Sequence, residues 1–318
     1  MARSLAGLDL AWHRGLVLFA LIAQRATPTN LALVAAAPRG VDFRILAPEQ
    51  ALGAVGAGDS VLGRLDVLET LDGVDDGLWA LGSLAARGVH TLNRASALMA
   101  AHDKLLTARL LLRAGLPHPR TRVLTGGRPL PELDGPVVVK PRFGSWGRDV
   151  VRCRDAAVLR RHVRQLEARP WFRAHGAIVQ ELVPPEGHDL RIVVAAGTVV
   201  GAISRVSAPG EWRTNVALGA SRVAIEPPAD ACALALAAAA AAGAELLGVD
   251  LLPDGNGGYT VLELNGAVEF TAEYALDRDP FAAAAWELSR RALRCPQGPA
   301  GRTPPAPLLP VEATPLEA

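Results

Sequence analysis

Short apolar runs separated by turn-forming and mixed segments recur along the chain, a pattern typical of proteins that alternate strands with helices. In the first third, runs at 31–35, 42–46 and 59–66 predict three strands. The apolar segment 16–23 is too short to cross a bilayer and has a poor basic flank for a signal peptide. We interpret it as the apolar side of a first helix, in a small α/β domain over residues 1–92.

The second part, residues 93–180, opens with a helical spacing of apolar residues. These apolar residues are at positions 98, 105, 106, 110 and 112. Ser96 is a candidate N-cap for one helix that continues through Lys104. Gly115 and Pro117 are expected to end that helix, because glycine favours a C-terminal cap and proline cannot continue it.

The third part, residues 181–295, contains an alanine-rich run and a hairpin. Alanine is the strongest helix former, so 231–244 predicts a helix, which we expect to pack beneath the hairpin. The hairpin turn is indicated at 253–258, which is rich in Gly, Asp and Asn. The proline-rich residues 296–318 predict a disordered tail.

Three oxygen-bearing side chains are placed to share one face of this hairpin. Glu263 and Asn265 are two residues apart, and strand side chains alternate between faces, so both point the same way. Asp250 on the preceding strand reaches that face if the two strands pair. Such a doubly anionic set suits Mg²⁺, which usually binds few protein ligands together with substrate phosphates. The alternative is an ordinary hairpin with Leu262 and Leu264 buried and the polar side chains in solvent.

A lysine and a loop with two glycines follow the β-branched run 136–139. Lys140 ends this predicted strand, and a fixed ammonium is a point charge for phosphate oxygens. The loop 144–148 lets backbone amides approach a polyphosphate, although it matches neither a Walker A loop nor a dinucleotide fingerprint. Gln180 and Glu181 end another apolar strand, where a carboxylate can accept hydrogen bonds from an adenine amino or ribose hydroxyl group. An ordinary turn and an edge-of-sheet pair are the alternatives.

In this order the segments resemble the ATP-grasp superfamily, and within it the RimK-like amino-acid ligases. The markers are 101–104, 139–141, 144–148, 180–181, 189–191, 212–215, 248–250 and 263–265. The resemblance implies an ATP-grasp fold, α/β with α+β lobes. It consists of an N-terminal α/β pre-ATP-grasp domain (1–92), a central lobe with a lid loop (93–180) and a C-terminal lobe with the metal site (181–295). Residues 212–215 and 266–274 look more like the branch that acts on amino-group carrier proteins in lysine and arginine synthesis.

The resemblance also implies a role for each matching position. The residues similar to those that hold ATP phosphates are Lys104 and Lys140. Those similar to the lid over the phosphates are Gly144, Ser145, Trp146, Gly147 and Arg148. The adenine hinge and the ribose contact correspond to Gln180, Glu181, Leu182, Val183 and Asp189. The groups for the γ-phosphate and the substrate carboxylate correspond to Arg191, Arg205, Arg213 and Asn215. The ligands of two Mg²⁺ ions, with Mn²⁺ as a substitute, correspond to Asp250, Glu263 and Asn265.

The activity implied is ATP- and Mg-dependent formation of an amide or peptide bond. A carboxylate takes the γ-phosphoryl group of ATP to give an acylphosphate and ADP, and an amine then displaces phosphate. The expected partners are ATP, an amino acid such as L-glutamate or a relative, and a carboxylate on a peptide, a carrier protein or a metabolite. The alternatives are a small-molecule ligase of the D-alanine–D-alanine type and a non-catalytic ATP-binding regulatory module. The intact set of three metal ligands argues against the module.

Composition narrows the cellular setting. The 318 residues carry 33 basic and 32 acidic side chains, a net charge of +1, which gives no electrostatic footprint for nucleic acid. The three cysteines form no CxxC pair, which disfavours a disulfide framework or a zinc ribbon. We therefore expect a cytoplasmic homo-oligomer without membrane or nucleic-acid partners.

Arginines do cluster at positions 142, 148, 152, 154, 160, 161 and 164. A solvated helix face is the simplest interpretation of this cluster. The alternative is a landing patch for an acidic carrier protein or peptide.

Overall fold

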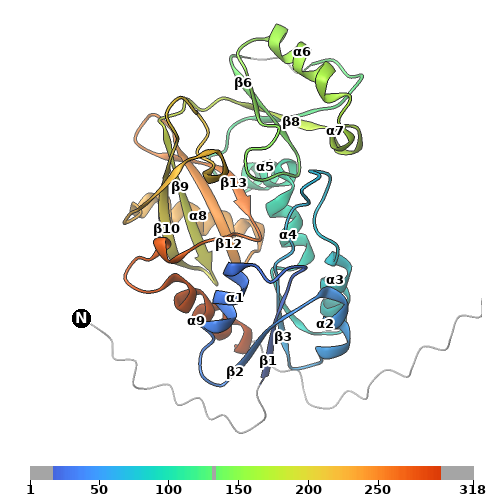
Figure 1. Ribbon diagram of the computed structural model, residues 1–318, viewed down its shortest axis with the longest axis vertical. Coiled ribbons are helices and arrows are strands. Elements are labelled where there is room, and N and C mark those ends of the chain that lie inside the picture. The colour runs from blue at the N-terminus through green and yellow to red at the C-terminus, as the bar shows by residue number, and fades with distance from the viewer. Residues whose placement is uncertain (1–16, 131–133, 295–318) are drawn as a thin grey trace, which may run out of the picture.

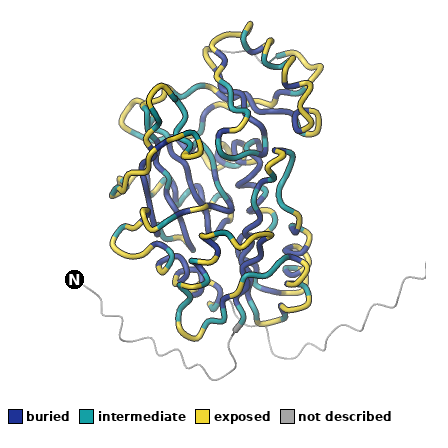
Figure 2. Tube along the Cα trace, in the orientation of Figure 1, coloured by how far each residue is buried: buried dark blue, intermediate teal, exposed yellow. Residues whose placement is uncertain are grey.

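The computed structural model describes residues 17–130 and 134–294, which form three sheets with helices around them (Figure 1). Our expectations for residues 1–16 and for the proline-rich tail lie outside the described residues. Among the described helices, none is long and apolar enough to cross a membrane. The strands of all three sheets are mostly buried, whereas the outer loops and the small lobe around α6 (Ala156–Leu166) are largely exposed (Figure 2).

The N-terminal domain contains a parallel four-stranded sheet in the order β2-β1-β3-β4. Its strands are β1 (Val17–Ile22), β2 (Val41–Leu46), β3 (Ser60–Gly63) and β4 (His90–Leu92). Its helices are α1 (Pro28–Ala35), α2 (Pro48–Ala54) and α3 (Leu78–Ala86). The α/β character of this domain and the strands expected near 42–46 and 59–66 are confirmed.

Two of the elements expected in this domain are wrong. Segment 16–23 contains the inner strand β1, paired with β2 and β3, rather than a helix. A strand inside a parallel sheet is buried on both faces, so its apolar run shows no alternation and resembles a short helix. Segment 31–35 is the end of helix α1. Thr27 caps this helix by accepting from the backbone N–H of Asn30, and Pro28 occupies its first turn, a start signal that the apolar run concealed.

The central lobe is an antiparallel sheet in the order β5-β8-β6-β7. Its strands are β5 (Thr121–Leu124), β6 (Val137–Pro141), β7 (Val151–Cys153) and β8 (Ala177–Glu181). Its helices are α6 and α7 (Pro170–His175), whereas the preceding helices α4 (Ala95–His102) and α5 (Lys104–Arg113) pack mainly against α8 (Ala229–Ala242) and the five-stranded sheet described below.

The single helix expected from Ser96 through Lys104 is instead two helices. Asp103 ends α4 in an extended conformation and caps α5 by accepting from the backbone N–H of Leu105 at 3.0 Å. Ser96 lies inside α4, and the cap position belongs to Arg94. The break places Lys104 at the first position of a new helix.

The C-terminal lobe is a five-stranded antiparallel sheet in the order β11-β10-β9-β12-β13. Its strands are β9 (His188–Ala195), β10 (Thr198–Val206), β11 (Ser221–Ala224), β12 (Leu246–Pro253) and β13 (Tyr259–Asn265). Its helices are α8 (Ala229–Ala242) and α9 (Pro280–Leu293), with short 3-10 turns at Val216–Leu218 and Ala272–Tyr274. The β12–β13 hairpin is confirmed, and so is the alanine-rich helix that packs beneath it.

Side-chain alternation along β9 explains where the charged residues lie. Leu190, Ile192 and Val194 pack on one face with the alanines of α8. Val193 and Ala195 belong to the other face, in the cluster that contains the apolar side of α9. Asp189 and Arg191, at the start of β9, have the same parity as Val193 and Ala195 and so belong to this second face. The part of this face near the start of β9 therefore carries charged side chains.

Candidate functional site

A cleft of about 910 Å³ between the central lobe and the five-stranded sheet collects most of the residues singled out in the sequence. The expected residues that line it are Lys104, Lys140, Gly144, Ser145, Trp146, Gly147, Arg148, Gln180, Glu181, Leu182, Val183, Asp189, Arg205, Arg213, Asn215 and Glu263.

Lys140 is delivered to this cleft by β6 and is 7% exposed. Its Nζ donates to Gln180 Oε1 at 2.7 Å, and Gln180 Nε2 donates in turn to Thr121 Oγ1 at 3.0 Å. Burial lowers the pKa of Lys140 to about 8, because removal from water disfavours the charged form. A neutral amide therefore orients an ammonium group that an anionic ligand would stabilise strongly.

Lys104 links the glycine-containing loop to the hairpin. Its Nζ donates to the Gly144 carbonyl at 2.6 Å and lies 3.6 Å from Glu263 Oε2. Its backbone N–H donates to the Arg142 carbonyl at 3.0 Å, which fixes the start of α5 against the loop. Lys104 thus lines the same cleft as Lys140, from the start of α5.

The loop 144–148 is shaped by two consecutive residues with positive φ, Trp146 at 60° and Gly147 at 71°. A Cβ on Gly147 would lie 2.8 Å from Asn215 Oδ1, so only glycine fits there without a shift. Arg213 Nη1 donates to the Gly147 carbonyl at 3.1 Å, and the Arg148 guanidinium lies 5.0 Å from the Trp146 ring centre. Segment 212–215 is therefore fastened to this loop.

Four charged residues form a row across the five-stranded sheet, of which Asp189, Arg205 and Asp250 are buried and Arg191 is partly exposed. Arg191 donates to Asp250 through Nε at 2.7 Å and Nη2 at 2.6 Å, and the two residues are register partners. Arg205 bridges Asp189 and Asp250, with its Nη2 2.9 Å from Asp250 Oδ2. Although burial opposes ionisation, the two guanidinium groups hold the pKa of Asp250 well below its usual range.

The three proposed metal ligands have different surroundings. Asp250 is fully buried, and its carboxylate already accepts three hydrogen bonds from arginines. Glu263 makes an ion pair with Lys104, whose Nζ lies 3.6 Å from its Oε2. The Asn265 amide Nδ2 is buried without a hydrogen-bond partner among the described residues, a cost that an acceptor oxygen of a bound substrate would remove, whereas a metal would bind Oδ1.

An oxygen set of this kind fits Mg²⁺ only with help from substrate phosphates. Within the described part of the chain, no three His, Cys, Asp or Glu side chains cluster as a complete metal site. Glu263 and Asn265 fit best, and Asp250 retains acceptor capacity on its carboxylate. The assignment of all three as ligands stays a prediction.

Two further assignments also stay predictions, because the structure gives these side chains protein partners. The Glu181 carboxylate accepts from the backbone N–H of Arg120 at 2.9 Å and from its Nε at 3.0 Å. Asp189 is fully buried and accepts from Arg205 and from Thr214 Oγ1, at 2.6 Å for the latter. The nucleotide contacts expected of Glu181 and Asp189 would therefore compete with these protein partners.

A second cavity, of about 820 Å³, adjoins the first. The residues common to both are Ser145, Trp146, Arg205, Asn215 and Glu263. Arg191 and Asn265 line only the second one.

The sequence reasoning missed several residues of both cavities. Those of the cleft include Trp212 and Thr214, which stood in a recognised motif without an assigned role. Those of the second cavity include Asp66, His102, Arg222, Glu269 and Tyr274. Asp66 belongs to the N-terminal domain, and no local motif marks it as a site residue.

The arginine cluster is only partly a surface patch. Arg142 is drawn inward to Asp103, with which it makes an ion pair. Exposed side chains remain at Arg148, Arg152, Arg154, Arg160, Arg161 and Arg164. The exposure fits a solvated face, and the role of a landing patch stays a prediction.

Comparison with protein families gives a match to the RimK-like ATP-grasp domain over residues 101–277, more than half of the chain. The chain belongs to this family. As a RimK-like ATP-grasp protein it is a ligase that forms carbon–nitrogen bonds, and the ATP-grasp fold expected from the sequence is confirmed. The alternative of a non-catalytic nucleotide-binding module is thereby set aside. Enzymes of this family use ATP and Mg²⁺.

Two relatives show the range of acceptors near this ligase. It is 32% identical to the glutamate–LysW ligase ArgX of Sulfurisphaera tokodaii over 200 residues, 61% of this chain and 70% of the relative. It is 31% identical to the tetrahydromethanopterin:alpha-L-glutamate ligase of Methanosarcina acetivorans over 196 residues, 56% of this chain and 58% of the relative.

A solved RimK-domain ATP-grasp protein from Sphaerobacter thermophilus has the same fold. The TM-score is 0.60 at 24% identity, covering 86% of this chain and all of the other. The ATP-grasp ligase PsnB, in a structure with Mg and ADP, is also similar in fold, with a TM-score of 0.55 at 17% identity over 87% of this chain and all of the other.

Proposed function

We propose that this ligase joins the amine of an amino acid, L-glutamate or a close relative, to a carboxylate on a peptide, carrier protein or metabolite. The reaction proceeds through an acylphosphate and releases ADP and phosphate. The observation that carries the proposal is the contact between two cavities at Glu263 and Arg205. With ATP bound in the cleft, its γ-phosphate would lie next to the second cavity. That cavity then gives the carboxylate that receives the phosphoryl group a space of its own.

The cations of the cleft suit ATP. Lys104 at the start of α5 and Lys140 on β6 both line the cleft with the loop 144–148, and each ammonium is a point charge for phosphate oxygens. The adenine would lie toward the hinge at 180–183. Phosphoryl transfer needs mainly positioning and charge neutralisation, which fixed cations provide without reorganisation.

The metal would be held by Glu263 and Asn265, together with Asp250 on the neighbouring strand. Two Mg²⁺ ions are expected, with Mn²⁺ as a substitute. Bound Mg²⁺ supplies charge neutralisation at the phosphates. The protein's own part is to keep Glu263 beside Lys104 and to keep the Asn265 amide inside the second cavity.

The two arginines of the charged row retain donors for a carboxylate. Arg191 and Arg205 each bond to their aspartates through Nε and Nη2, which leaves Nη1 of each without a hydrogen bond to the described residues. A guanidinium group has five N–H donors in a fixed fork, so a second anion can still be bound. Both arginines line the second cavity, where a carboxylate becoming an acylphosphate would lie.

The choice of amino acid and acceptor is supported by relatives that transfer glutamate to LysW or to tetrahydromethanopterin. If the acceptor is an acidic carrier protein, the exposed arginines 148–164 offer it a complementary surface.

Hydroxylamine trapping tests the proposal directly. With ATP, Mg²⁺ and pools of carboxylates but no amine, hydroxylamine should convert the acylphosphate to a hydroxamate, with one ADP released for each. Arg213→Ala should abolish trapping while keeping most of the ATP affinity, because Arg213 fastens the loop at Gly147 rather than binding the adenine. Release of AMP and pyrophosphate in place of ADP would show that the mechanism is wrong.

A further inference from the structure

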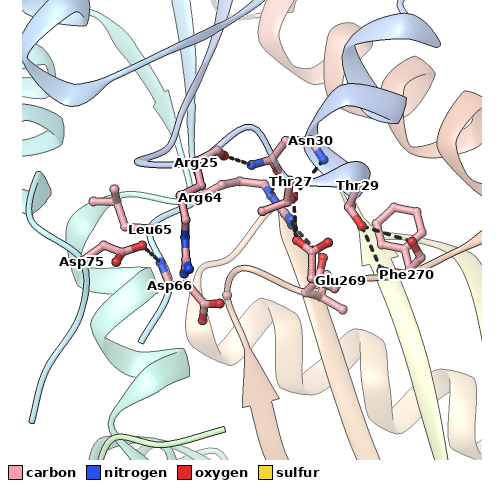
Figure 3. A network of polar contacts seen from close by, with 12 residues as sticks. Arg25, Thr27, Thr29, Asn30, Arg64, Leu65, Asp66, Asp75, Glu269 and Phe270 are labelled. Carbon is pink, nitrogen blue, oxygen red and sulfur yellow. Dashed lines mark hydrogen bonds and ion pairs between the residues drawn. The ribbon is translucent and has the colours of Figure 1, made fainter. Parts of the chain in front are cut away.

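A buried arginine joins the N-terminal domain to the C-terminal lobe beside the second cavity (Figure 3). Arg64 follows β3 and is 3% exposed. Its Nε donates to Asn30 Oδ1 at 2.7 Å, its Nη1 to the Val268 carbonyl at 2.9 Å and its Nη2 to Glu269 Oε1 at 3.1 Å. These bonds fix the loop after β3 against the segment that follows β13.

The same loop carries Asp66 to the wall of the second cavity. Asp66 Oδ1 accepts from the backbone N–H of Val67 at 2.7 Å, and the backbone N–H of Asp66 donates to Asp75 Oδ2 at 3.0 Å. Among the described residues no cationic side chain pairs with the Asp66 carboxylate, and none donates to its Oδ2. Burial, with Asp75 and Glu269 nearby, raises the pKa of Asp66, while Arg64 and the Val67 N–H act against this.

The charged side chains around the loop after β3 include more carboxylates than cations. Arg64 neutralises one of three carboxylates, those of Asp66, Asp75 and Glu269. Arg25, the other arginine at the adjoining small cavity, is exposed and lies 3.9 Å from Glu69. A cation that enters the second cavity would therefore find uncompensated negative charge.

Most of the positive side chains that line the second cavity come from one part of the protein, and the negative side chains nearest the N-terminal domain come from another. The five-stranded sheet contributes Arg191, Arg205 and Arg222 together with one acid, Glu263, whereas the junction with the N-terminal domain contributes Asp66 and Glu269. The unpartnered amide of Asn265 lies in the same lining. A ligand with carboxylate groups and one ammonium group matches such a lining, whereas a plain carboxylate leaves the anionic side unpaired.

We propose that Asp66, with Glu269 beside it, binds the ammonium group of the amine substrate, an acidic α-amino acid that shares the second cavity with the carboxylate being activated. The inference rests on the proposed function and adds Asp66, a residue outside residues 101–277, the part of the chain that matches the family. The N-terminal domain then selects the amine, and the two lobes that follow it activate the carboxylate.

Calorimetry on the full chain with Mg²⁺ and a non-hydrolysable ATP analogue tests this subsite. The probes are two pairs of ligands that differ in the ammonium group, L-glutamate with glutarate and L-2-aminoadipate with adipate. The wild type should bind at least one amino acid more tightly than its deaminated partner. Asp66→Asn should lower the affinity for that amino acid roughly 10- to 100-fold, the usual effect of losing a hydrogen bond between charged groups. The affinity for the diacid should stay unchanged.

Asp75→Asn is the matched control. Asp75 belongs to the same network but does not line the second cavity, and an asparagine oxygen can still accept from the Asp66 N–H. It should keep the wild-type preference. If Asp66→Asn keeps that preference as well, the subsite is wrong.

The outcomes separate this inference from the function on which it rests. Hydroxamate formation needs no amine subsite, so Asp66→Asn should retain it. A wild type that traps hydroxamate but discriminates neither pair would overturn the subsite alone. A wild type that traps no hydroxamate would overturn the ligase proposal.

Discussion

Glu263 faces Asp250 across the β12–β13 pair, yet the two carboxylates have opposite surroundings. Asp250 is fully buried and receives both Arg191 and Arg205, whereas Glu263 borders both cavities and has Lys104 at 3.6 Å. Neighbouring acids in one hairpin therefore have separable roles. Asp250 balances the two arginines, whereas Glu263 keeps its carboxylate at the border of both cavities.

Glu263→Gln should cripple turnover while leaving the fold intact. The change keeps the shape of the side chain but removes the charge expected to hold Mg²⁺ at the phosphates. Loss of one such group typically lowers the rate about 10²- to 10³-fold. ADP release at saturating Mg²⁺ measures the effect, with circular dichroism as the control for folding. Near-normal turnover would contradict the role of Glu263.

Asp250→Asn should instead destabilise the protein. It leaves Arg191 and Arg205 with one buried countercharge, Asp189, between them. Breaking a buried ion pair by removing one partner typically costs about 3–5 kcal/mol in the free energy of unfolding. Urea denaturation of both variants gives the comparison. Equal stability of Asp250→Asn and Glu263→Gln would show that the arginines do not depend on Asp250.

The different surroundings of these acids show what the sequence can and cannot predict. Alternation along β12 and β13 was enough to predict that Asp250, Glu263 and Asn265 share one face, because side-chain period is a local property. It gave no information on Arg191, which reaches Asp250 from β9, 59 residues away in sequence. Pairing between distant strands depends on the whole sheet, so the row of charges emerged only in three dimensions.

The errors in the fold have a similar cause. A helix was predicted where strand β1 lies, and a strand where helix α1 ends, because both segments are short and apolar. Contacts with neighbouring elements in space decide between strand and helix for such segments. The break at Asp103 was overlooked because the apolar spacing continues across it. Asp66 was missed as a site residue since only the packing of the N-terminal domain brings it to the second cavity.

Near pH 8, the enzyme should take up a proton at Lys140 when it binds nucleotide. The pKa of Lys140 is lowered to about 8 by burial, so at pH 8 about half of the free enzyme carries a neutral lysine. The phosphates favour the charged form, which means that ATP affinity falls as the pH rises through 8. Calorimetry in buffers of different ionisation enthalpy should give an uptake of about half a proton per nucleotide.

Lys140→Arg is the matched control for this uptake. An arginine stays charged throughout the range, so the variant should bind nucleotide without taking up a proton. Lys140→Met should lose both the uptake and most of the affinity. A wild-type uptake that persists in Lys140→Arg would belong to another group and would contradict the assignment.

Trp146 should keep water from the acylphosphate. Its side chain belongs to the lining of both cavities, and it adopts a positive φ that is unfavourable for tryptophan. Such strain persists only where the surroundings hold the residue, here through the bond from Arg213 to Gly147 and the stacking of Arg148. Trp146→Gly relieves the strain but removes the ring between the cavities. Because an exposed acylphosphate is hydrolysed, the variant should release clearly more than one ADP per bond formed. Trp146→Phe, which keeps a ring, should stay close to one. A ratio near one in Trp146→Gly would mean that the ring has no part in excluding water.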